Sequence, residues 1–170
     1  IDLAALTPGI SVPLDVLLDV LLRAESAAGR CDLGLILGSR FTLDMHGLLG
    51  RLMGCSATLR HAVMDFVRWQ PTHSTTAVVY LIPMGADVAW GYGSEHGGHP
   101  GARLLQEAVM AVAMRMLHEL TGMPVAPAEV LMSHQAPADV APHAAVLRVP
   151  VRFDQPLTCV VMHERMLDMK

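Results

Sequence analysis

The stretch PGARLLQEAVMAVAMRMLHELTG, residues 100–122, decides how the rest of the chain can fold. Pro100 suits the first position of a helix, and Gly122 is typical of the residue that follows its last turn. Between positions 108 and 114 every side chain is apolar, whichever way it points. A helix that is apolar all round has to be covered on every side. We therefore expect residues 101–121 to form the central, most buried helix.

The first 70 residues predict a layer of shorter helices. Leucines between positions 14 and 22 repeat at helical spacing, after Pro13 and before Gly29, so they mark one amphipathic helix. Further helical segments are expected at 33–37 (ended by Gly38), at 45–53 (ended by Gly54) and from an N-cap at Ser56 to Pro71.

On either side of the central helix the pattern changes to strands. Residues 75–82 are rich in β-branched side chains, PMGA (83–86) suggests a turn, and DVAWGYG (87–93) alternates, which together indicate a hairpin. After the helix we expect a strand at 128–133, a short helix at 138–147 and a strand at 157–162. The order predicts one α+β domain. A helical layer (about 1–70) precedes a ββαβαβ antiparallel or mixed sheet packed on the long buried helix (about 71–170).

Composition narrows the class of protein. The chain has 170 residues, 52% of them hydrophobic and 16% charged, with a mean hydropathy of +0.41. Its apolar runs are too short or too interrupted to cross a membrane. The net charge is −4, and no cluster of Lys or Arg is present to neutralise phosphates, which argues against nucleic-acid binding by this chain itself.

The termini and cysteines suggest where the protein resides. The opening IDLAALTPG, residues 1–9, lacks the basic start and small-residue cleavage site of a signal peptide. Cys31, Cys55 and Cys159 form no CxxC pair and leave an odd thiol, as in proteins of a reducing compartment. We therefore expect a cytoplasmic protein.

Two stretches carry residue types that occur in catalytic or metal sites. GLLGRLMG (47–54) has the glycines of a phosphate loop but no Lys, and it follows a predicted helix, so its glycines are better explained as joints between helices. The loop SEHGGH gathers Glu95, His96 and His99, which could share a metal ion, although a glycine-rich loop positions ligands poorly. No other catalytic motif occurs. We expect no enzyme activity, no catalytic residue, no metal ligand and no cofactor.

A ligand cavity is expected where the sheet meets the long helix, because two apolar layers meet there. Ligand pockets combine apolar walls with a few placed polar groups, and so does an ordinary core. The candidate lining residues are Tyr80 and Trp90 from the hairpin and Met110 and Met114 from the helix, with His118 or His134 as polar anchors.

Several short motifs, spread over nearly the whole chain, together resemble one family. They are Leu37-Gly38, GLLG (47–50), SATLRHA (56–62), HQAPADV (134–140), VPVRFD (149–154) and VVMHERMLD (160–168). In these motifs the sequence is similar to the N-terminal effector-binding domain of AraC-type transcription regulators, in the subgroup called arabinose-binding-like.

The resemblance implies the ligand-sensing and dimerisation domain of a bacterial transcription regulator. Its implied partners are a small effector, a second copy of the chain in a homodimer, and DNA, the last only through a helix-turn-helix domain that lies outside this sequence. Met and aromatic residues in the expected pocket favour an apolar or amphipathic effector over a sugar. The alternatives are a pure oligomerisation module without a ligand and a metal-dependent enzyme using Glu95, His96 and His99.

Overall fold

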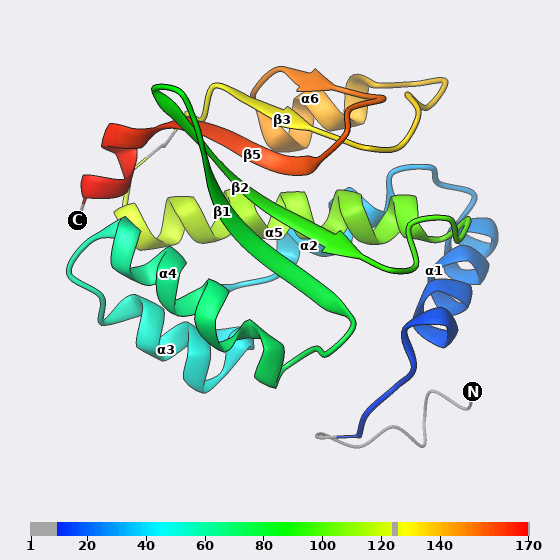
Figure 1. The fold of residues 1–170 in the computed structure, drawn as a ribbon. Helices are drawn as coiled ribbons and strands as arrows, with labels where there is room; N and C mark the ends of the chain where they lie inside the picture. Colours follow the sequence, from blue (N-terminus) through cyan, green and yellow to red (C-terminus); the bar gives the residue numbers. More distant parts are fainter. Residues whose placement is uncertain (1–9, 124–125, 170) are drawn as a thin grey trace.

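The computed structural model describes residues 10–123 and 126–169 (Figure 1). The opening stretch 1–9, weighed above as a leader, lies outside the described part. Within that part no helix is both long enough and apolar enough to cross a bilayer.

The predicted N-terminal helical layer is confirmed, with three corrections. The helix predicted at 45–53 is broken at Gly47, whose φ is 58°, into a 3-10 turn and a short helix that includes Gly54. The helix predicted to start at Ser56 begins instead after Thr58, whose Oγ1 accepts a hydrogen bond from the His61 backbone N–H at 3.3 Å. The helix predicted to end at Gly38 continues to Arg40. The bounds are α1 Leu14–Ala28, α2 Leu33–Arg40, η2 Leu43–His46, α3 Leu48–Gly54, α4 Leu59–Trp69 and η3 Gln70–Thr72.

The sheet is mixed and has the order β1-β2-β5-β3-β4. Its strands are β1 Ala77–Met84, β2 Asp87–Ser94, β3 Glu129–Leu131, β4 Val151–Arg152 and β5 Thr158–His163. All neighbouring pairs are antiparallel except β3 and β4, which run parallel. The short strand β4 was not predicted, because two residues carry no periodicity. It is joined to β3 through the helix α6 (Ala141–Leu147), as a parallel pair requires a crossover.

The hairpin is confirmed, but its turn is shorter than predicted. β1 runs through Pro83 and Met84, and the chain reverses at Gly85, whose φ of 73° suits glycine. Pro83 is tolerated because β1 is an edge strand of the sheet.

The long helix α5 (Ala102–Thr121) runs through the middle of the molecule, with α3 and α4 on one side and β3, β5 and α6 on the other (Figure 1). Within α5 only His118 is exposed. Val88, Trp90 and Tyr92 of β2 belong to the same core cluster as Met110 of α5. The prediction of a central buried helix against the sheet is confirmed.

Helix α2 lies directly against another face of α5. A Cβ at Gly34 would come within 2.3 Å of the Leu104 carbonyl oxygen, and one at Gly38 within 2.1 Å of the Ala108 carbonyl oxygen. Only glycine permits so close a backbone approach. This contact explains why Gly38 lies inside α2 and not at its end.

Candidate functional site

The cavity predicted between the sheet and α5 exists only as a small void. Trp90 and Met110 both line it. Its volume is about 30 Å³, the space of roughly one water molecule, whereas small-molecule pockets enclose ~300–1,000 Å³. The Trp90 ring packs edge-on against Phe66, with 5.9 Å between the ring centroids. In this structure the region is hydrophobic core.

The other predicted lining residues lie elsewhere. Tyr80 covers Gly91, where a Cβ would come within 2.3 Å of its ring, and its hydroxyl donates to the Thr158 carbonyl oxygen at 3.3 Å. Burial raises the pKa of Tyr80 to about 12. Met114 is half-buried at the edge of the core. His118 is exposed, with its Nδ1 3.0 Å from the Met123 carbonyl oxygen, so it does not face the sheet.

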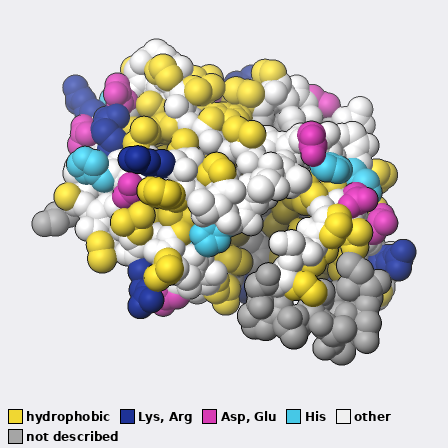
Figure 2. Space-filling model, turned by 60° about the horizontal axis from the view of Figure 1, so that its bottom comes forward, with side chains coloured by type: hydrophobic (Ala, Val, Ile, Leu, Met, Phe, Trp, Pro, Cys, Tyr) yellow, Lys and Arg dark blue, Asp and Glu magenta, His cyan; other side chains and the backbone are white. Residues whose placement is uncertain are grey.

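A larger hollow lies on the outer side of α3. It is an open groove of about 540 Å³ formed by η2, α3 and the end of α4. Four of its apolar side chains are strongly exposed, Leu48 most of all at 76%. Figure 2 brings forward the underside of Figure 1, where α3 and α4 lie, and shows hydrophobic side chains spread over that face. The groove is lined by Met45, His46, Gly47, Leu48, Leu49, Leu52, Trp69, Thr72 and His73.

His46 is the most constrained polar residue of this groove. Its ring lies between Phe41 and Phe66, at centroid distances of 4.8 Å and 5.3 Å. Its Nε2 is buried and has no hydrogen-bond partner among the described residues. Burial first, and the nearby His73 second, lower the pKa of His46. The imidazole is therefore neutral at physiological pH.

The loop considered as a metal site does not gather its three side chains. His96 Nδ1 lies 3.9 Å from a Glu95 carboxylate oxygen, and that carboxylate is 73% exposed. His99 points elsewhere, with Nε2 3.5 Å from Asp19 and Nδ1 accepting from the Gly101 N–H at 3.0 Å. The proposed use of this loop as an enzyme's metal centre has no geometric support.

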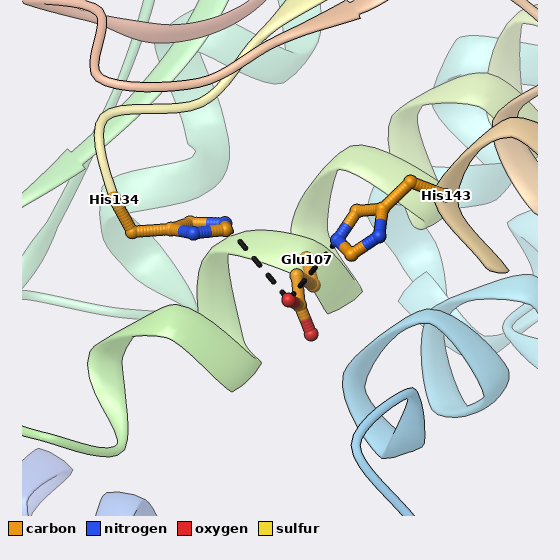
Figure 3. Close-up of side chains that lie close together, drawn as sticks. All are labelled: Glu107, His134 and His143. Carbon is orange, nitrogen blue, oxygen red and sulfur yellow. Dashed lines mark hydrogen bonds and ion pairs between the residues drawn. The ribbon is translucent and has the colours of Figure 1, made fainter. Parts of the chain in front are cut away.

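A different group of three potential metal ligands lies where α5, α6 and the segment after β3 meet (Figure 3). Glu107 of α5, His134 after β3 and His143 of α6 each place one ligand atom within 4.8 Å of the other two. Glu107 Oε1 is 3.1 Å from His143 Nε2 and 3.9 Å from His134 Nε2 (Figure 3). The side chains are 0%, 10% and 2% exposed for Glu107, His134 and His143. Within the described part of the chain, no other such group is found.

The Glu107 carboxylate is held in place by an arginine one helical turn away. Arg103 Nη1 donates to Oε1 at 2.9 Å and to Oε2 at 3.1 Å. The same guanidinium forms an ion pair with Glu25 of α1 and donates to the Cys31 carbonyl oxygen. A buried carboxylate is costly unless it is paired and hydrogen-bonded. Arg103 meets part of that need, because its one positive charge is shared between Glu107 and Glu25.

Sequence reasoning found only one member of this cluster. His134 was predicted as a polar anchor, but for the cavity between sheet and helix, and the structure places it against Glu107 instead. A signal for Glu107 was present, because it is three residues after Leu104 and three before Met110, on the buried face of the helix. Nothing in the sequence alone brings His143 to the same place.

Comparison with known proteins gives a consistent match. The model of a family described as the arabinose-binding domain of AraC transcription regulators, N-terminal, matches residues 1–170. The solved structure of the transcriptional regulator CdpR from Pseudomonas aeruginosa is similar in fold, with a TM-score of 0.66 and 16% identity. That likeness covers 94% of this chain and 58% of the other, so this chain spans little more than half the length of that regulator. No curated protein matches the sequence.

Proposed function

Because this chain belongs to the family of N-terminal arabinose-binding domains of AraC transcription regulators, we propose that it senses a small effector and dimerises on behalf of such a regulator. The family match over residues 1–170 is the observation that carries this proposal. A family of regulators also favours a non-catalytic role.

The proposed mechanism is linkage between two sites. An effector that binds one arrangement of the domain more tightly shifts the population of regulators competent to bind DNA. DNA itself would be contacted by a separate helix-turn-helix domain, because this chain carries a net charge of −4 and no basic cluster.

The groove at α3 is the proposed effector site. Its volume of about 540 Å³ falls within the range of small-molecule pockets, whereas the void beside Trp90 does not. Leu48, Leu52 and Trp69 supply apolar walls, and His46 and His73 supply polar atoms. This lining suits an amphipathic molecule with one polar head group and an aliphatic or aromatic body.

A thermal-shift experiment distinguishes an effector site in the groove from one in the core between the sheet and α5. The probes are a panel of amphipathic small molecules, because any one that binds only the folded state raises the melting temperature with its concentration. Leu48→Lys should abolish the shift at little cost to stability, since Leu48 is 76% exposed. Met64→Lys on the exposed face of α4, where Met64 is 51% exposed, is the matched control.

The outcome separates the two candidate sites. A shift that survives Leu48→Lys and Trp69→Ala but is lost in Met114→Ala would place the effector between the sheet and α5. A shift lost only in the groove variants supports the proposal. In the full-length regulator, the same probe should then change promoter occupancy.

A further inference from the structure

The strongest unassigned feature is the buried contact between a carboxylate and two imidazoles. Glu107 comes from α5, His134 from the segment after β3 and His143 from α6, and the three side chains point toward one another (Figure 3). A hydrogen bond of 3.1 Å joins His143 Nε2 and Glu107 Oε1, but it does not account for the approach of His134, whose Nε2 has no hydrogen-bond partner among the described residues. The proposed effector groove includes none of the three side chains.

The hydrogen bond between His134 Nδ1 and the Gln135 carbonyl oxygen fixes which nitrogen of the neutral ring carries the proton. Its Nδ1 lies 2.9 Å from the Gln135 carbonyl oxygen, which can only accept, so Nδ1 carries the ring proton. In the neutral ring, Nε2 then presents a lone pair toward Glu107 Oε1, 3.9 Å away. Nε2 is buried and has no hydrogen-bond partner in the described residues. A cation placed between these two acceptors would satisfy both of them.

The donor set and its spacing suit a zinc-like ion. Ligand atoms around a tetrahedral zinc ion lie about 3.3 Å apart, given bonds of about 2.0–2.1 Å. The 3.1 Å between Glu107 Oε1 and His143 Nε2 is close to that value. The 3.9 Å to His134 Nε2 requires only a small inward movement of that ring. Two imidazoles and one carboxylate are the ligands of open zinc sites, in which water takes the fourth position.

The surroundings orient two of the three ligands, Glu107 and His134. The Gln135 carbonyl oxygen fixes the tautomer and orientation of His134, which is the usual arrangement behind a ligating imidazole. Arg103 fixes the Glu107 carboxylate. Because Arg103 is shared between Glu25 and Glu107, one negative charge of this group remains uncompensated.

We infer that Glu107, His134 and His143 form a binding site for a divalent transition-metal ion of the zinc type. The ion would join α5, the segment after β3 and α6 through one bond to each. This inference stands independently of the proposed effector groove, because it shares no residue with it.

The test is metal binding by the chain after treatment with a chelator. Zinc should bind with a stoichiometry of one and raise the melting temperature, and cobalt should give the visible absorption of a tetrahedral site. His134→Gln should weaken zinc binding at least about tenfold. Loss of a group that only orients a metal ligand already costs about that much affinity, and His134 would be a ligand itself. His118→Gln, an exposed histidine on the same helix as Glu107, should leave the affinity unchanged.

The affinities of the ligand variants distinguish a built zinc site from chance binding. Equal affinity in the wild type, His134→Gln and His143→Gln would mean an adventitious ion on surface histidines, and absence of stoichiometric binding would overturn the site. Circular dichroism verifies that each variant folds. X-ray absorption of the zinc-loaded wild type tests the site without any variant. A zinc ion bound by two imidazoles and otherwise by oxygen atoms supports the site, and a sulfur ligand contradicts it.

Discussion

His46 shows how a single side chain makes stability depend on pH. It lies between two phenylalanine rings, and burial lowers the pKa of His46 below its usual 6.5. As the pH falls below that value, the unfolded chain takes up the proton before the folded one does. The free energy of unfolding therefore falls with falling pH. The stability that depends on a neutral His46 is fully present only above about pH 6.5.

We predict that His46→Gln flattens this pH dependence. The wild type should lose stability as the pH is lowered from neutral, and the variant should lose less over the same window. Part of the slope remains, because burial also lowers the pKa of His134. Urea unfolding at a series of pH values measures both slopes, and identical slopes would exclude His46 as a contributor.

Single residues were the hardest part to predict from sequence. Trp90 and Met110 were correctly placed together, because hairpin alternation and helical period put both on inward faces. The approach of His134 to His143 depends on how the crossover between β3 and β4 places α6, and the loop residues before α6 carry no periodicity that would show it. The groove at α3 was missed for a related reason. Exposed apolar residues such as Leu48 look like core residues in a sequence.

At the scale of elements, the packing of α2 on α5 depends on Gly38. We predict that Gly38→Ala lowers the free energy of unfolding by about 1–3 kcal/mol, the usual cost of overpacking a tight contact. The new Cβ would meet the Ala108 carbonyl oxygen at 2.1 Å, and a backbone atom inside a central helix cannot move aside. The gain in helix propensity from Gly to Ala, about 1 kcal/mol, offsets only part of this cost.

The matched control for this prediction is Gly54→Ala in α3. There a Cβ would meet nothing closer than the Leu43 side chain at 3.8 Å. Chemical denaturation of both variants makes the comparison. A Gly38→Ala protein as stable as the Gly54→Ala protein would show that α2 can move away from α5 freely.

Helices and strands were predictable to the extent that their burial is periodic. α1, α4 and α5 carry apolar side chains on one face or on all faces, and the sequence of β2 alternates large and small side chains, so the existence of these elements followed from pattern. The burial of β2 itself does not alternate, because residues 88–92 are all buried. Their ends depend on contacts that the sequence does not display. Because Gly38 packs against the Ala108 carbonyl oxygen, it lies inside α2 and does not end it. Because β1 is an edge strand, it can include Pro83.

At the scale of the whole molecule, we predict a two-fold dimer formed through β1. In α5 only His118 is exposed, which argues against α5 as the interface, whereas β1 is a sheet edge with Val78, Ile82 and Met84 exposed. Val78→Lys should shift the association to higher concentration without unfolding the protein, since Val78 is 64% exposed. Sedimentation velocity is the measurement, with Met64→Lys as control. A wild type that stays monomeric at high concentration contradicts this dimer.

The position of β5 has a consequence for how the protein is made. Although β5 is the last strand in the chain, it lies in the middle of the sheet, between β2 and β3. Until residues 158–163 have left the ribosome, the hairpin of β1 and β2 and the pair of β3 and β4 are separate fragments with open edges. Strand pairs between distant parts of a chain form slowly, and the strand edges stay exposed until they form. The two fragments of the nascent sheet therefore keep unpaired strand edges until β5 pairs with both β2 and β3.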